Sequence, residues 1–330
     1  MITPALQLTA TERVLPRLAL DFTTGTLDPR ITFTRSGNTA TRINASGAIE
    51  TVNADTPRFD FDPVTLACKG LLIEELRKNL LLNTDSLATQ NVTVAAVAHT
   101  LSFYGDGQVV LSGTHLSTVT GTGAYPLRKT YTFTPTAGTL TVTVTGTVQY
   151  AQLEAGAFAT SYIPTTTTAL TRNADVATMT GTNFSDWFNA TQGSMFIGTY
   201  STPATSAVLV RMYPNAGGNS ANNTIYFDVN PNVRLVTFNG ASATVCNTGA
   251  KQTFGTKMNV VGGYKVNSFA ASQNAVNPVT QVSGGIPAVT PDTLAIGSTG
   301  VNTSYVNGWI TEFMYWPQRL TNAEVQAFSK

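Results

Sequence analysis

The carboxylates best suited to acid–base chemistry stand near the start of the chain. Asp60 and Asp62 are two residues apart in RFDFD, so in a strand both side chains would lie on one face, and hydrolysis of a glycosidic bond uses two carboxylates. Arg58 and Pro63 flank them, which favours a salt-bridged turn over a catalytic pair. We therefore interpret this pair as structural.

The other candidate acids, bases and ligands are scattered. Glu74 and Glu75 are adjacent, so in a strand they would point to opposite faces. His99 and His115, the two histidines, lie in β-prone segments without metal-ligand spacing. No nucleophile elbow, phosphate-binding loop or dinucleotide fingerprint occurs. The sequence predicts that the protein is not an enzyme and uses no cofactor or metal.

Sugar binding requires only an aromatic face and a few polar groups. The candidates for such a glycan site are Trp316, Trp309, Tyr305, Asn302 and Trp187. In a strand Trp309 and Ile310 face opposite ways, so an inward Ile310 turns Trp309 toward solvent or a neighbouring domain. Packing remains the alternative role for each tryptophan.

The elements that must position these residues are strands. Only 11% of residues are charged, whereas 56 are threonine, a β-branched residue that suits a solvated strand face. Leu140, Val142 and Val144 alternate with threonines, which predicts a strand with one buried face.

The net charge is +1 and no basic block occurs, so nucleic acid is not an expected partner. No apolar run is long enough to span a membrane, and we expect no membrane insertion.

We expect an all-β chain of two antiparallel sandwiches. Residues 1–80, which hold 18 of the 37 charged residues, are too turn-broken for a core of their own and predict a docking segment. Residues 81–163 predict the first sandwich, the Thr-rich residues 164–175 a protease-sensitive linker, and residues 176–330 a second sandwich. Cys68 and Cys246 are expected to be free thiols.

The last residues differ from the rest of the chain. Asn307-Gly308 indicates a turn, and Ile310 to Trp316 is rich in β-formers. Thr321 and Glu324 have the spacing of a capping box, which predicts a short C-terminal helix. This segment resembles the end of concanavalin/laminin-G-like jelly rolls. The resemblance implies that the helix closes one open end of the sandwich. We expect Leu320 and Phe328 to be buried beneath it, and Trp316 to be more exposed if it is a ligand platform.

Two other segments resemble structural proteins of tailed bacteriophages, in which they lead into and close a carbohydrate-binding-module-like sandwich. The matching residues of the first segment are Arg35, Pro57, Arg58, Phe59, Pro63, Gly70, Leu71, Glu74 and Asn79. Those of the second are Gln152, Glu154, Gly156, Ser161, Tyr162, Pro164 and Arg172. The resemblance implies a virion protein, made in the bacterial cytoplasm, that binds other virion proteins and forms a homo-oligomer, a trimer by analogy.

Three functions follow from these observations. The expected function is a fibre or decoration protein that docks through residues 1–80 and displays its sandwiches outward. An alternative is a receptor-binding protein that holds host surface glycan in the C-terminal jelly roll. A glycan depolymerase is a third reading, which the shortage of carboxylates and histidines disfavours.

Overall fold

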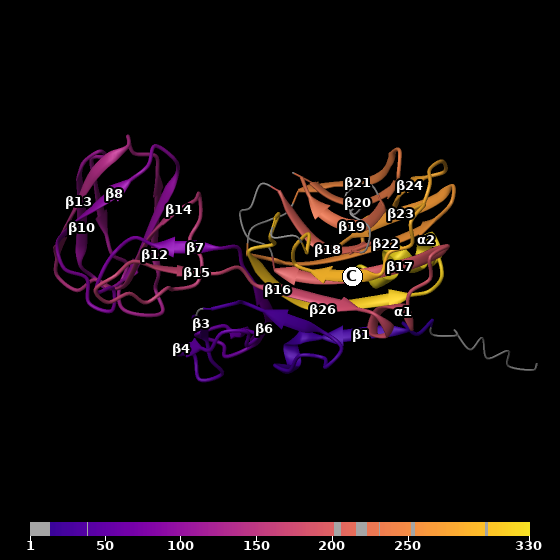
Figure 1. Ribbon diagram of the computed structural model, residues 1–330, viewed down its shortest axis with the longest axis horizontal. Coiled ribbons are helices and arrows are strands. Elements are labelled where there is room, and N and C mark those ends of the chain that lie inside the picture. The colour runs from indigo at the N-terminus through magenta and orange to yellow at the C-terminus, as the bar shows by residue number, and fades with distance from the viewer. Residues whose placement is uncertain are drawn as a thin grey trace, which may run out of the picture.

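The regular secondary structure of the described residues is almost entirely antiparallel β-strand, which confirms the all-β prediction. The computed structural model describes residues 14–37, 39–200, 206–215, 223–230, 232–251, 255–300 and 303–330. Figure 1 shows a smaller and a larger β-sandwich side by side. Within those ranges no helix has the length and hydropathy needed to cross a bilayer.

The smaller sandwich packs a four-stranded sheet against a three-stranded sheet. The first has the order β11 (Ser117–Thr120), β10 (Gln108–Gly113), β13 (Gly138–Thr145) and β8 (Gln90–Val94). The second has the order β12 (Lys129–Phe133), β9 (His99–Tyr104) and β14 (Gln149–Ala155). Leu140 and Val142 of β13 are fully buried, as their alternation with threonine predicts.

The larger sandwich packs an eight-stranded sheet against a seven-stranded one. The eight-stranded sheet has the order β24 (Val279–Gln281), β23 (Ser268–Gln273), β22 (Lys257–Lys265), β17 (Gln192–Tyr200), β26 (Gly308–Trp316), β6 (Cys68–Ile73) and β5 (Phe59–Phe61), and β1 (Leu18–Asp21) also pairs with β26. The seven-stranded sheet has the order β2 (Thr32–Thr34), β16 (Val176–Thr180), β25 (Thr293–Ile296), β18 (Ala207–Tyr213), β19 (Asn223–Val229), β20 (Asn232–Asn239) and β21 (Ala243–Lys251). A short 3-10 turn, η1 (Phe22–Thr24), and a short helix, α1 (Thr182–Ser185), lie between strands.

The N-terminal segment is built into the larger sandwich and does not stand apart from it. Strand β1 pairs with Glu312–Tyr315 of β26, and β6 pairs with Gly308–Ile310 of the same strand. Leu18 and Leu71 are buried in the shared core. The reason is that β26 would otherwise leave an unpaired edge, and these strands complete its hydrogen bonds. A docking role for this segment stays a prediction.

Residues 164–175 also differ from the expected loose linker. Strand β15 (Leu170–Arg172) pairs with β7 (Arg77–Asn79), so the two connections between the sandwiches form a ribbon. Thr165 is buried and donates its hydroxyl to the Leu81 carbonyl at 2.7 Å. Hydroxyl groups that find buried acceptors allow a threonine-rich stretch to pack tightly.

The chain closes with β26 and α2 (Asn322–Phe328), and the predicted capping box of Thr321 and Glu324 is present. Helix α2 covers the outer face of the eight-stranded sheet, because Leu320 and Val325 pack there with Phe196 and Trp316. The resemblance implied that this helix closes an open end of the sandwich, and that expectation is wrong. The expected burial of Phe328 is also wrong: it is 36% exposed and stacks on Trp316, which is only 2% exposed.

A candidate ligand-binding cleft at the domain junction

The two sandwiches meet at a buried ionic cluster of three arginines and two carboxylates. Arg35 Nη1 lies 3.0 Å from Asp175 Oδ1, and Arg58 pairs with both Asp175 and Glu74. Arg172 Nη1 lies 3.2 Å from Glu74 Oε2. Burial alone would raise the pKa of Glu74, but Arg172, Arg58 and hydrogen bonds from Ser161 outweigh it and lower the pKa to about 2. Glu74 is therefore held ionised.

Residues from both phage-like segments make this junction. Asn79 donates its amide to the Ala151 and Ile163 carbonyls, at 3.0 and 2.8 Å. Glu154 accepts from the Thr160 backbone N–H at 2.8 Å. At Gly156, with φ +141°, a Cβ would fall 1.6 Å from the Arg77 guanidinium. These residues thus hold the ribbon of β7 and β15 against the smaller sandwich, and Ser161 links that sandwich to Glu74 of the ionic cluster.

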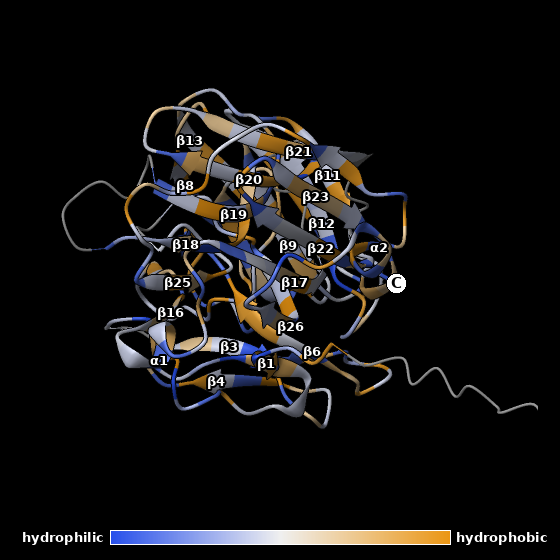
Figure 2. Cartoon of the chain, turned by 90° about the vertical axis from the view of Figure 1, so that its right-hand side faces the viewer, coloured by the Kyte–Doolittle hydropathy of each residue, from blue (hydrophilic) through white to orange (hydrophobic). Residues whose placement is uncertain are grey.

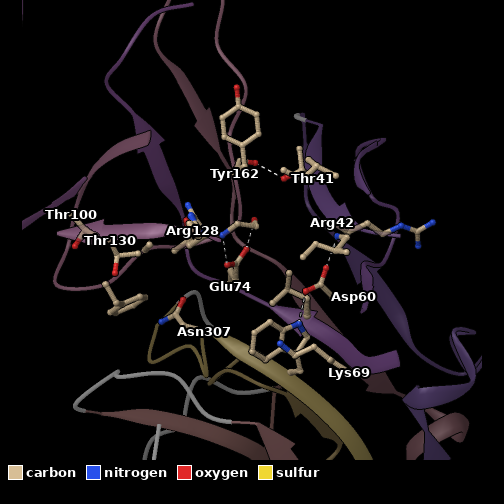
Figure 3. Close-up of a pocket in the computed structure, with 18 of the residues that line it drawn as sticks. Thr41, Arg42, Asp60, Lys69, Glu74, Thr100, Arg128, Thr130, Tyr162 and Asn307 are labelled. Atoms are coloured by element: carbon tan, nitrogen blue, oxygen red, sulfur yellow. Dashed lines mark hydrogen bonds between the residues drawn. The ribbon is translucent and has the colours of Figure 1, made fainter. Parts of the chain in front are cut away.

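A cleft of about 530 Å³ lies beside this junction. One wall belongs to the smaller sandwich, where the outer face of β9 and β12 presents Thr100, Thr130 and Thr132. The opposite wall comes from Asp60, Lys69 and the hairpin of β3 (Ala40–Ile43) and β4 (Ile49–Val52). Figure 3 shows these two walls, with Arg128 and Glu74 between them and Asn307 below. Figure 2 shows the chain from the side of the larger sandwich, with the N-terminal strands beneath it.

Trp309 is one of four aromatic residues that line the cleft, with Tyr104, Phe158 and Tyr162. Its indole N–H donates to Asp60 Oδ2 at 2.8 Å, and the Lys69 ammonium lies 3.5 Å from the ring centroid. Burial raises the pKa of Asp60, although hydrogen bonds from the Ile43 backbone and Trp309 oppose the rise. Burial likewise lowers the pKa of Lys69. Ile310 is fully buried, so strand alternation turns Trp309 away from the core and into the cleft.

Arg128 crosses the polar wall. Its Nη1 donates to the Thr160 carbonyl and its Nη2 to Ser102 Oγ, both at 2.7 Å. Its Nε is buried and has no hydrogen-bond acceptor among the described residues. The side chain as a whole is half-buried and lines the cleft.

The structure separates the five predicted site residues. Trp309 lines the cleft, whereas Trp187 and Tyr305 are each 3% exposed. Trp316 donates its indole N–H to the Val14 carbonyl at 2.8 Å and belongs to the cluster beneath α2. Asn302 lies outside the described residues. The described candidates other than Trp309 are thus packing residues in this fold.

The sequence reasoning missed Lys69 and Arg128 as site residues. Lys69 directly precedes the recurring Gly70, which is the one local signal that pointed toward it. Arg128 lies in a turn that joins two strands of the smaller sandwich, and no motif marks it. Long-range folding alone brings both side chains to one cleft.

The structure also places the groups considered for catalysis. Asp62 accepts from the Val64 and Thr65 backbone at 3.0 and 2.8 Å and holds a turn, while Arg58 pairs elsewhere, so the predicted Arg58 salt bridge at this turn is wrong. His99 Nδ1 lies 2.8 Å from the Val97 carbonyl, and His115 packs against aromatic rings. No group of three metal-ligating side chains occurs within the described ranges.

Asp60 and Glu74 both reach the cleft, and their pKa values move in opposite directions. Acid–base catalysis uses such a difference. Here both oxygens of each carboxylate already accept protein hydrogen bonds, from Ile43 and Trp309 on Asp60 and from Ser161 on Glu74. The arrangement therefore favours a structural role for both.

No protein-family model matches the chain, and no curated protein matches it significantly. Among solved structures, it is similar to the sialidase CBM40 of Ruminococcus gnavus bound to α2,3-sialyllactose, with 14% identity, a TM-score of 0.36, and coverage of 43% of this chain and 83% of that one. The K499G mutant of NanB sialidase from Streptococcus pneumoniae gives 10% identity, a TM-score of 0.39, and coverage of 46% and 26%. Trypanosoma rangeli sialidase with the inhibitor DANA gives 16% identity, a TM-score of 0.33, and coverage of 46% of this chain and 25% of that one. The chain thus spans about a quarter of these two sialidases, and the similarity concerns the β-sandwich fold alone.

Proposed function

We propose that this protein is a non-enzymatic structural appendage of a tailed bacteriophage particle, in which two sandwiches are displayed as one rigid body. The observation that supports it most is the junction: residues of both phage-like segments, among them Arg58, Glu74 and Arg172, meet in one buried ionic network. Such a network holds a single geometry, because separating its charges would leave them buried and unpaired. A displayed body needs that rigidity.

Attachment to other virion proteins through residues 1–80 is part of this proposal. Most of this segment is built into the larger sandwich, so an attachment would have to use its outer surface. Four large apolar side chains of the segment are exposed and could serve there: Leu15, Val64, Leu66 and Leu76. A homo-oligomer, with a trimer as the expected state, remains a prediction.

The test is to purify particles on a density gradient after lysis of the bacterial host and to locate the chain in them. We expect mass spectrometry to find it at a fixed ratio to the other particle proteins, and antibody labelling in electron micrographs to place it on the outside. If the chain stayed in the soluble lysate while complete particles lacked it, the appendage function would be wrong.

A second function is favoured by the cleft. Trp309, exposed threonine hydroxyls and a guanidinium converge on one volume of about 530 Å³, which suits the apolar face and hydroxyl groups of a sugar ring. We propose that the appendage binds surface glycan in this cleft, between the domains and not within the jelly roll alone.

A glycan array of the wild type and Trp309→Ala tests whether glycan binds in this cleft. We expect the wild type to bind and the variant to lose binding at a temperature at which thermal unfolding shows both to be folded, because losing the bond to Asp60 lowers the melting temperature of the variant. Unchanged binding by Trp309→Ala would place the site elsewhere.

A further inference from the structure

The charges around the cleft do not balance. Arg42 Nε lies 2.9 Å from Glu50 Oε2, so this pair is neutral. Asp60 and Lys69 lie near each other and offset one another. The junction behind the cleft is balanced, because its four arginines face four carboxylates: Arg35, Arg58, Arg77 and Arg172 against Glu74, Glu75, Glu154 and Asp175. Arg128 is left as the excess positive charge, because no described carboxylate lies within ion-pair distance of it.

Arg128 is held in place, but not all of its N–H donors have an acceptor among the described residues. Ser102 and Thr160, both buried, accept from its two terminal nitrogens and fix the guanidinium against β9. A guanidinium has five N–H donors, and the described residues accept from two of them. A positioned guanidinium with spare donors is suited to a planar anion such as a carboxylate, which it can bind through two parallel hydrogen bonds.

The groups around Arg128 are suited to the rest of a sugar. Thr130 and Thr132 project from β12 on the cleft side and are exposed. The Thr130 hydroxyl has no partner among the described residues, so it can exchange hydrogen bonds with a sugar hydroxyl. Across the cleft, Trp309 supplies apolar surface.

We propose that the cleft selects acidic saccharides, with the sugar carboxylate bound by Arg128 and the ring lying between Thr130 and Trp309. The inference rests on the glycan-binding function proposed above and narrows its ligand class. Hydrogen bonds to a charged group contribute more than neutral ones, so an acidic sugar should bind about tenfold or more tightly than its neutral counterpart.

The experiment compares two oligosaccharides that differ only at one sugar, glucuronic acid or glucose, by calorimetry on the full chain. The variants are Arg128→Met and the control Lys129→Met, which makes the same charge change at the next residue, outside the cleft lining. We expect the wild type and Lys129→Met to prefer the acidic form about tenfold or more, and Arg128→Met to bind both forms equally. In the wild type, binding of the acidic form should weaken with added salt while binding of the neutral form stays constant.

The outcomes separate the two proposals. Equal wild-type binding of acidic and neutral forms overturns the selectivity and leaves glycan binding intact, whereas no binding of either, with no binding on the array, overturns both. Inorganic phosphate that binds alone, and competes as well as the acidic sugar, would mean that the site takes a simple anion and the inference is wrong. If Arg128→Met failed to fold, salt-independent binding of the acidic form by the wild type would still refute the inference.

Discussion

Trp309 donates its indole N–H to Asp60 across 249 residues of sequence, and this bond joins the closing strand β26 to β5 in the wall of the cleft. Asp60 is 5% exposed and accepts a second bond from the Ile43 backbone at 2.6 Å. The tryptophan that is placed to meet a ligand therefore also stabilises a buried carboxylate. Stability and binding are linked at this residue.

Trp309→Phe removes the indole N–H and should destabilise the protein in a pH-dependent way. Burial already raises the pKa of Asp60, and losing this hydrogen bond raises it further. A carboxyl whose pKa is raised on folding lowers stability as the pH rises through that pKa. We expect a cost of about 1–3 kcal/mol at pH 8 and a smaller one at pH 4, measured by urea unfolding. In an Asp60→Asn background the same substitution should show no such pH dependence; if it does, another group is responsible.

Glu74 should make the protein sensitive to acid. Its pKa is lowered from an ordinary 4.5 to about 2, so its contribution is present above about pH 4.5 and is lost as the pH falls toward 2. This corresponds to roughly 3 kcal/mol of unfolding free energy at neutral pH. Glu74→Gln leaves Arg58 and Arg172 short of a carboxylate and should cost about 3–5 kcal/mol at pH 7. Urea titrations between pH 7 and pH 2.5 should give a flatter pH profile for the variant than for the wild type.

Digestion with trypsin tests the packing of residues 164–175. Arg172 is fully buried and paired with Glu74, so cleavage after it requires that the junction open first. Lys257 and Lys265 are exposed, and cleavage there should come earlier. Mass spectrometry of the first fragments shows whether trypsin cleaves first after Arg172 or after Lys257 and Lys265. Early cleavage after Arg172 would support the loose linker that composition alone predicted.

Local patterns predicted much of the fold, and long-range contacts account for the rest. The alternation in β13, the strand after Asn307-Gly308 and the capping box depend on neighbours in sequence, and all are present. The sequence left Trp316 open between ligand binding and packing, because its partner Val14 lies 302 residues away. The cleft was missed for the same reason: Asp60, Arg128 and Trp309 come from three separate parts of the chain.

The residues around α2 should differ in their contribution to stability. Leu320 is 1% exposed in the cluster beneath α2, whereas Phe328 is 36% exposed against Trp316. Leu320→Ala should cost about 2–5 kcal/mol, because truncating a buried leucine loses its transfer free energy and leaves a cavity. Phe328→Ala should cost less, since its ring already meets solvent. Thermal unfolding of the full-length variants measures both, and a larger loss for Phe328→Ala would contradict this arrangement.

Gly70, one of the residues shared with the phage-like segment, should tolerate no side chain. It has φ +105°, and a Cβ there would lie 2.2 Å from the Ile310 carbonyl oxygen, which is backbone and cannot move aside. Gly25 is the matched control, because its φ is +74° but no atom lies within 4 Å of a Cβ. Gly25→Ala should cost about 1–2 kcal/mol from backbone strain alone. Gly70→Ala should cost more than that, since strand β6 would also have to separate from β26, and the larger sandwich would lose its pairing with the N-terminal segment.

Chemical unfolding of both variants gives the difference between the two costs in free energy of unfolding. Equal costs would show that β6 and β26 do not approach this closely, and the N-terminal strands would then be free to leave the sandwich and serve as a separate docking arm.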